Sequence, residues 1–228
     1  MKRFLMLFIL INTKFTYAQS KFYYGDNIFK EEILSIGLQD WQLKIAQKEK
    51  KTILDYFYLL PKRLLEGELY IENDNLNFRK KIIEENNKPH NYLNIKNGYL
   101  IASPSAYVIM ALFKDRVNKK DIIGIVRGCG GVPYIICDYA FIEYNADTLN
   151  WKLNKEVFPW DEFYKKTEEL ESSKTWGDFN EILPEIVLPE YGTKITVLDS
   201  DSSKTENSYH KLFEIIWDKQ NFKINNFP

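Results

Sequence analysis

The pattern of apolar residues changes at about Tyr92, and this change constrains the fold more strongly than any other feature of the sequence. Between residues 27 and 85, apolar side chains recur at the spacing of amphipathic helices in three segments, 27–36, 40–60 and 78–85. Between residues 92 and 225, short runs rich in β-branched and aromatic residues are separated by Asn, Asp, Gly and Pro, as in antiparallel strands. Helices that precede a series of hairpins predict an α+β fold, with N-terminal helices packed on a mainly antiparallel sheet.

The β-rich region is predicted to open with a hairpin at Asn97-Gly98, because this dipeptide suits a two-residue type I′ turn with positive φ at both positions. One amphipathic helix is expected near residues 160–172, and the proline-containing segment 175–192 is expected to cross between strands as a loop. Without internal repeats, residues 19–228 are predicted to form a single α+β domain. Further strands are expected at residues 107–113, 121–127, 134–144, 151–153, 194–198, 209–217 and 222–224.

Residues 1–18 have the order of charges and apolar residues that is typical of a secretory signal peptide. Lys2 and Arg3 precede an unbroken apolar run at 4–11, and Ala18 ends a cleavage box of small residues. The run is much shorter than the roughly 20 residues that span a bilayer as a helix. A buried N-terminal helix is the alternative. We expect a soluble periplasmic or secreted chain that begins near Gln19, with no transmembrane segment after cleavage.

Removal of the predicted signal peptide leaves 28 basic and 32 acidic residues, a formal net charge of −4. This balance argues against nucleic acid as a partner, because nucleic-acid-binding proteins usually carry a basic excess on one face. The chain is 45% hydrophobic and 15% aromatic, which is ample material for a folded core.

Both cysteines lie in the glycine-rich stretch at residues 127–137, RGCGGVPYIIC, which allows three interpretations. A phosphate-binding loop would need a following helix N-terminus, but Pro133 and a β-rich run follow instead. A redox site would favour the spacing Cys-X-X-Cys. A hairpin centred on Pro133 would place Cys129 opposite Cys137 and Arg127 opposite Tyr139, within reach of a disulfide in an exported protein. The sequence therefore predicts a Cys129–Cys137 disulfide.

The sequence contains no recognisable catalytic or metal-binding motif, so no catalytic residue, metal or cofactor is predicted. Two cysteines and two distant histidines do not form a zinc site, and no Gly-x-Ser-x-Gly element is present. The carboxylates of residues 161–171 alternate with lysines as on a solvated helix face. Asp199 and Asp201 lack the central glycine and the final glutamate of a calcium loop.

Several blocks occur in an order that resembles a family of uncharacterised exported bacterial proteins. The blocks are DYFYLLP at residues 55–61, NGYL at 97–100 and ALF at 111–113. They consist of packing and turn residues and belong to a resemblance that covers most of residues 53–198. The resemblance implies a common fold and carries no activity or catalytic residue.

The aromatic content and the stiff hairpins favour a fixed binding surface, so we expect a non-catalytic protein that binds a protein or glycan in the cell envelope or outside the cell. Tyr134, Tyr139 and Trp151 are the candidate binding residues, because aromatic rings combine apolar faces with a polar edge. The alternative is an envelope hydrolase with dispersed carboxylate or serine catalytic residues. An exposed aromatic patch would favour binding, whereas a pocket lined by groups with perturbed pKa values would favour catalysis.

Overall fold

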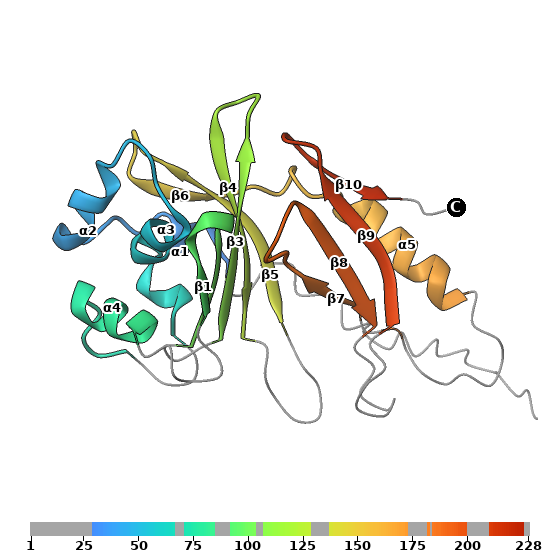
Figure 1. The fold of residues 1–228 in the computed structure, drawn as a ribbon, viewed down its shortest axis with the longest axis horizontal. Helices are drawn as coiled ribbons and strands as arrows, with labels where there is room; N and C mark the ends of the chain where they lie inside the picture. The colour runs from blue at the N-terminus through green and yellow to red at the C-terminus, as the bar shows by residue number, and fades with distance from the viewer. Residues whose placement is uncertain are drawn as a thin grey trace, which may run out of the picture.

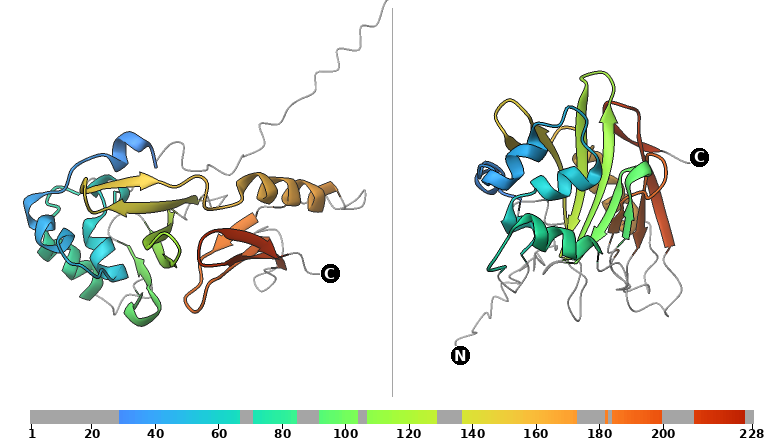
Figure 2. Two further views of the ribbon diagram at one scale, coloured as in Figure 1. Left: turned by 90° about the horizontal axis from the view of Figure 1, so that it is seen from above. Right: turned by 60° about the vertical axis from the view of Figure 1, so that its left-hand side comes forward.

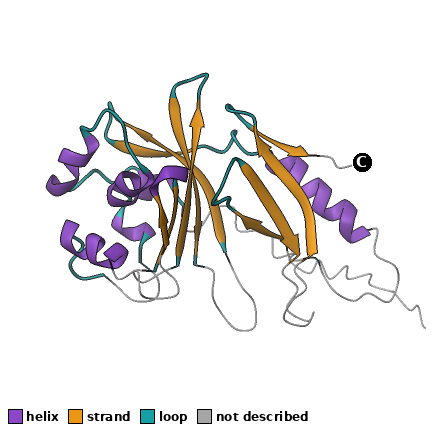
Figure 3. Cartoon of the chain, viewed as in Figure 1, coloured by secondary structure: helices purple, strands orange, loops and turns teal. Residues whose placement is uncertain are grey.

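The computed structural model describes residues 29–66, 71–84, 92–103, 107–128, 137–172, 182, 184–199 and 210–225. These residues form five α-helices and two antiparallel sheets, which confirms the predicted α+β fold (Figure 1). The four helices between residues 31 and 84 lie on one side of the larger sheet, and the smaller sheet and the helix at residues 160–172 lie on the other (Figures 1 and 3). Among the described residues, no helix is long and apolar enough to cross a membrane.

Both sheets are meanders, in which neighbouring strands are also consecutive in the sequence. The six strands of sheet A are β1 (Tyr92–Asn94), β2 (Tyr99–Ala102), β3 (Val108–Asp115), β4 (Lys120–Arg127), β5 (Asp138–Asn145) and β6 (Asn150–Leu153). The four strands of sheet B are β7 (Pro184–Val187), β8 (Lys194–Asp199), β9 (His210–Trp217) and β10 (Phe222–Asn225).

The helices are α1 (Glu31–Leu34), α2 (Asp40–Ala46), α3 (Ile53–Leu59), α4 (Leu76–Glu84) and α5 (Trp160–Ser172), with 3₁₀ turns η1 (Lys62–Leu64) and η2 (Ile95–Asn97). The continuous segment predicted at 40–60 is divided into α2 and α3, because Thr52 starts a new helix. The Thr52 side chain accepts a hydrogen bond from the Asp55 backbone amide, and the Asp55 carboxylate accepts one from the Thr52 amide. This reciprocal capping box satisfies amides that a helix start leaves without partners.

Sheet A is buried on both faces, so it separates two hydrophobic cores. Its first face, which includes Met110 and Ile125, packs against α1–α4. Its second face, which includes Phe113 and Phe141, packs against sheet B and α5. The view from above in Figure 2 shows sheet A between the N-terminal helices and sheet B.

The predicted hairpin at Asn97-Gly98 joins β1 and β2, but its turn differs from the expected one. Only Gly98 has a positive φ, of 69°, and it ends the 3₁₀ turn η2 rather than a two-residue turn. The Asn94 side chain caps this turn by accepting a hydrogen bond from the Asn97 amide at 3.2 Å. The position of the hairpin was therefore predictable, and its loop is longer than predicted.

The β4–β5 hairpin is present, but its predicted register is wrong by one residue. Arg127 lies opposite Asp138, and Tyr139 lies opposite Val126. A shift of one residue moves every side chain to the other face of a sheet. Because both faces of sheet A are apolar here, the sequence pattern does not distinguish the two registers.

The predicted disulfide lies partly outside the described residues. Cys137 is buried just before β5, whereas Cys129 lies outside the described part of the chain. Gly128 has a φ of +74°, which ends the regular alternation of β4 before Cys129. The pairing of β4 with β5 therefore does not fix the direction of Cys129, and the disulfide stays a prediction.

Strand β7 lies within the segment 175–192 that was predicted to be a loop. Pro184 is its first residue, and β7 is an edge strand of sheet B. Proline cannot donate a hydrogen bond to a neighbouring strand, but it is tolerated at the first residue of a strand and in edge strands. Because of these prolines, the sequence did not predict β7, which packs into the core between the two sheets.

Candidate functional site

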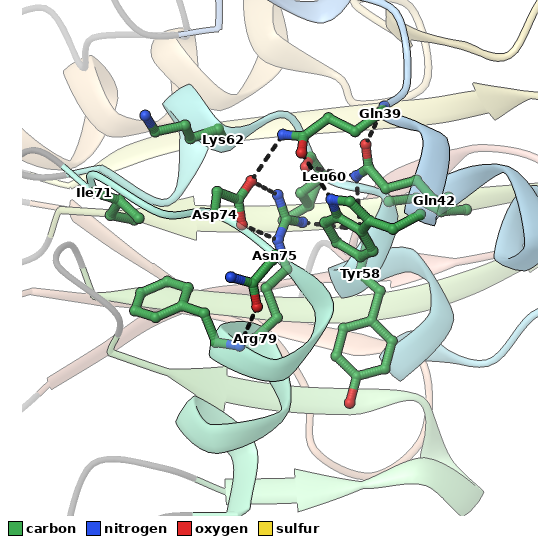
Figure 4. A network of polar contacts seen from close by, with 12 residues as sticks. Gln39, Gln42, Tyr58, Leu60, Lys62, Ile71, Asp74, Asn75 and Arg79 are labelled. Carbon is green, nitrogen blue, oxygen red and sulfur yellow. Dashed lines mark hydrogen bonds and ion pairs between the residues drawn. The ribbon is translucent and has the colours of Figure 1, made fainter.

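A buried polar network surrounds Arg79, which is fully buried on α4 (Figure 4). Its Nε and Nη2 donate to the two carboxylate oxygens of Asp74 at 2.8 and 2.6 Å. Its Nη1 donates to the carbonyl oxygens of Phe57 and Tyr58 at 2.8 and 2.9 Å. These carbonyls belong to the last turn of α3, where acceptors lack the regular i→i+4 partner of a helix interior. Arg79 therefore caps α3 and fixes α4 against it.

The side chains of α2 and the residue before it close the network from the other side. Trp41 Nε1 donates to Gln39 Oε1 at 2.7 Å, and the Arg79 guanidinium lies 5.1 Å from the centroid of the Trp41 ring. Gln42 Nε2 donates to the carbonyl oxygen of Tyr58 at 2.8 Å. The polar groups of the network bond to one another, so its role is structural: it holds α2, α3 and α4 together.

A second polar cluster joins the start of α3 to sheet A. The Tyr56 hydroxyl donates to Asp121 Oδ2 at 2.7 Å, and Lys114 Nζ lies 3.7 Å from Asp121 Oδ1. Lys51 Nζ lies 5.5 Å from the centroid of the Tyr144 ring. Burial lowers the pKa of Lys51, while nearby carboxylates oppose the shift. Asp121 thus pairs with Lys114 within sheet A and accepts a hydrogen bond from Tyr56 of α3, which again indicates a structural role.

The predicted binding residues Tyr139 and Trp151 are core residues. Each is only 4% exposed, and they lie in different hydrophobic cores. Trp151 Nε1 donates to the carbonyl oxygen of Leu59 at 2.9 Å, and the Tyr139 hydroxyl accepts from the Ile186 amide at 3.3 Å. Neither ring can therefore belong to an exposed surface, and the structure does not bring them together. Tyr134, the third predicted residue, lies outside the described residues.

Where sheet A meets sheet B, tyrosines and glutamates line the boundary that we call the tyrosine seam. Tyr99 and Tyr139 belong to the face of sheet A that packs on sheet B, and strand pairing places Tyr92 beside Ile101 on that face. Burial raises the pKa of Tyr99 to about 12, with smaller contributions from neighbouring seam residues. The members of the seam are Tyr92, Tyr99, Tyr107, Tyr139, Glu185, Glu190 and Tyr191.

The segment that contains β7 crosses sheet A and builds the seam. Its Ile186 amide bonds to Tyr139 on β5, and its Glu190 carboxylate accepts hydrogen bonds from side chains on β1. Between these points the segment passes over Gly124 on β4. A Cβ atom at Gly124 would lie 3.1 Å from Leu188 Cδ2, so the absence of a side chain permits this close approach. Figure 1 shows β7 beside β5, where this crossing begins.

One end of the seam is exposed and forms the tyrosine patch, which consists of Tyr92, Asn94, Glu190 and Tyr191. Glu190 Oε1 accepts from the Tyr92 hydroxyl at 2.5 Å and from Asn94 Nδ2 at 3.3 Å. The Tyr191 hydroxyl also donates to Glu190. The two residues Tyr92 and Tyr191 are nevertheless 41% and 66% exposed. The patch is the candidate functional site, because it presents two aromatic side chains to solvent in a fixed arrangement.

Hydrogen bonding shifts the pKa values of the patch in opposite directions. The bonds from Tyr92 and Tyr191 hold the pKa of Glu190 below its usual value. The same bond to Glu190 raises the pKa of Tyr191 to about 12. At neutral pH the patch therefore contains an ionised carboxylate beside the neutral phenol of Tyr191.

The other end of the seam contains Glu185, a half-buried carboxylate on β7. Burial raises its pKa, and no hydrogen bond or ion pair joins it to another residue in the described ranges. The phenol pKa values of Tyr107 and Tyr139 are raised mainly by burial and further by the charge of Glu185. Glu185 therefore holds its proton more strongly than an ordinary glutamate.

Comparison with known proteins adds no assignment: no family model matches the chain, and neither the curated proteins nor the solved structures gave a significant match. Within the described ranges, no group of three or more His, Cys, Asp or Glu side chains is arranged to hold a metal ion. The resemblance to exported proteins with the DYFYLLP block remains an expectation.

Sequence reasoning missed every member of the tyrosine patch. Tyr92 and Glu190 lie 98 positions apart, and they meet only because sheet B folds onto sheet A. A local signal exists in Glu190-Tyr191, where a charged residue and an aromatic residue stand between Pro189 and Gly192 in a turn. This signal indicates an exposed loop without identifying the strand that it meets.

Proposed function

We propose that this chain is an exported protein that acts by binding an envelope or extracellular partner through the tyrosine patch. The supporting observation is that Tyr92 and Tyr191 remain exposed while their hydroxyls bond to one carboxylate. Isolated exposed apolar residues are common on proteins, whereas grouped aromatic residues often mark binding sites. Rings that are already held in place lose little conformational entropy when a partner binds.

The other polar clusters support this choice because they are engaged within the fold. Arg79 caps a helix and pairs with Asp74, and Tyr56 links α3 to Asp121. The patch differs from both, since its aromatic members face solvent.

An envelope hydrolase is the second candidate, and one specific observation favours it. Glu185 is a half-buried carboxylate on β7, and burial raises its pKa. A carboxyl group that holds its proton in this way can act as a general acid. Under this candidate, Glu185→Gln would abolish turnover of an envelope glycan or ester while the fold is retained.

The binding proposal can be tested by photocrosslinking in the native cell. We would introduce p-benzoylphenylalanine at Tyr191 in the full-length chain and place it at Val117 as the control. Val117 is 63% exposed in the turn between β3 and β4 and does not belong to the patch. The Tyr191 position should give a discrete adduct that the Val117 position does not give. Equal adducts at both positions, or none at Tyr191, would contradict the proposal.

Export is tested separately by the intact mass of the native protein. Cleavage after Ala18 should leave Gln19 as the first residue, because the preceding residues have the order of a signal peptide. A cellular protein that retains Met1 would contradict this part of the proposal.

A further inference from the structure

The chemical groups of the tyrosine patch are those that recognise sugars. The exposed rings of Tyr92 and Tyr191 provide apolar surface, while Asn94 and Glu190 provide an amide and a carboxylate at the edge of the rings. A pyranose ring is likewise divided into an apolar C–H face and a rim of hydroxyl groups. Binding sites for small polar ligands combine aromatic surface with a few fixed polar groups in this way.

The polar groups of the patch retain hydrogen-bonding capacity. Glu190 receives hydrogen bonds from Tyr92, Asn94 and Tyr191, whereas an ionised carboxylate offers about four acceptor sites. The Asn94 amide nitrogen uses one hydrogen for Glu190 and carries a second one. An acceptor and a donor thus lie side by side, which matches two neighbouring hydroxyl groups on one sugar ring.

The charge of the patch selects against anionic ligands. Glu190 is ionised at neutral pH, because its hydrogen bonds keep its pKa low. Among the described residues, no lysine or arginine forms an ion pair with Glu190. An anionic sugar or a phosphate would therefore meet an uncompensated negative charge.

The size of the patch favours a small ligand over a protein partner. Stable protein interfaces bury about 800 Å² on each side and involve about 20–30 residues per partner. In the part of the chain that the structure describes, the exposed large apolar side chains nearest in sequence to Tyr92 and Tyr191 are Ile95 and Val187. Two rings with adjoining polar groups match one or two sugar units.

We infer that the tyrosine patch binds a neutral saccharide, with a sugar ring stacked on Tyr191 or Tyr92 and its hydroxyls bonded to Glu190 and Asn94. This inference rests on the proposed function, in which the patch is the binding surface. It adds the chemical class of the ligand, which the proposed function leaves open.

The test is isothermal titration of the purified full-length protein with four tetrasaccharides. Three probes are neutral, namely cellotetraose, maltotetraose and tetra-N-acetylchitotetraose, and tetragalacturonate is the anionic probe. At least one neutral probe should bind more tightly than tetragalacturonate. Tyr191→Ala should weaken this binding about tenfold, and Val117→Ala, which alters an exposed residue outside the patch, should leave it unchanged. Thermal unfolding of each variant would establish that the fold is retained.

Two further results separate failure of this inference from failure of the proposed function. Glu190→Gln removes the charge, so it should reduce the preference for neutral over anionic probes. The saccharide assignment is overturned if no neutral probe binds, if tetragalacturonate binds most tightly, or if Tyr191→Ala has no effect. If the benzophenone at position 191 then yields a protease-sensitive adduct, the partner is a protein and only the saccharide assignment fails. If it yields no adduct, both fail.

Discussion

Substitution of Arg79 by methionine should destabilise the protein severely, because the guanidinium satisfies several buried groups at once. Its loss leaves the Asp74 carboxylate, whose side chain is 1% exposed, without its cation. It also removes the hydrogen bonds from Arg79 Nη1 to the carbonyl oxygens of Phe57 and Tyr58 at the end of α3. Removal of one partner from a buried ion pair typically costs about 3–5 kcal/mol. This loss is a large part of the roughly 5–15 kcal/mol that stabilises an ordinary domain.

The assay is equilibrium unfolding in urea, followed by circular dichroism and by tryptophan fluorescence. The free energy of unfolding should fall by about 3–5 kcal/mol with the denaturant slope unchanged. Arg63→Met is the matched control, since Arg63 is 62% exposed and its Nη1 lies 3.7 Å from Glu66 Oε2. The control should change stability by less than about 1 kcal/mol. Equal effects of the two substitutions would refute the assignment of Arg79 as a structural joint.

A double variant tests whether the charge of Asp74 accounts for much of this cost. Asp74→Leu combined with Arg79→Met removes both charges, so the double variant should lose less stability than the two single variants added together. The carbonyl oxygens of Phe57 and Tyr58 each lose the hydrogen bond from Arg79 but keep one from the Leu60 amide and from Gln42 Nε2, so some loss of stability should remain in the double variant. Strict additivity would show that Asp74 and Arg79 do not stabilise each other.

Three further predictions follow from the second core and from the cysteines. Glu185→Gln should raise the melting temperature at pH 7 and leave it unchanged near pH 4. Burial raises the pKa of Glu185 in the folded state above its unfolded value of 4.5. The wild-type protein therefore loses stability as the pH rises above 4.5, and glutamine, which has no proton to lose, avoids this loss. An equal shift at both pH values would contradict this. Gly124→Ala should lower the free energy of unfolding in urea by about 1–2 kcal/mol. Overpacking of the core costs about 1–3 kcal/mol, and the reduced entropy of the unfolded chain offsets less than about 1 kcal/mol of this cost. A stabilised variant would show that Leu188, Phe113 and Phe141 move aside easily. Thiol titration of the denatured, unreduced native protein should find no free thiol, because we expect Cys129 and Cys137 to form a disulfide, and two free thiols would contradict it.

Much of the secondary structure could be predicted from the sequence because its signals are local. The expected strands at 194–198 and 222–224 match β8 and β10 within one residue, and the expected helix near 160–172 matches α5. Alternating apolar residues, turn residues and helical spacing are patterns within a few positions of the chain, so they can be recognised without knowledge of the tertiary fold. The division of 40–60 at Thr52 was also available in principle, since Thr52 and Asp55 have the spacing of a capping box.

The register of β4 with β5 and the candidate site depend on tertiary structure and could not be derived in the same way. Ile122 and Ile123 point to opposite faces, and both faces are buried, so either register satisfies the apolar pattern. Tyr139 and Trp151, which the sequence predicts to be binding residues, pack in the two cores instead. The exposed pair, Tyr92 and Tyr191, is assembled by the crossing of sheet B over sheet A, for which the sequence contains no local signal.

If a partner covers Tyr92 and Tyr191, both side chains should be shielded from hydroxyl radicals in the native cell. Oxidation of each residue would be measured by peptide mass spectrometry in the purified protein and in the native cell, relative to oxidation of Val117. The ratios for Tyr191 and Tyr92 should fall in the cell, while the ratio for Ile36, another exposed residue outside the patch, should be unchanged. If both tyrosines have the same ratios in the cell and in the purified protein, no partner covers them, which would contradict the proposed function.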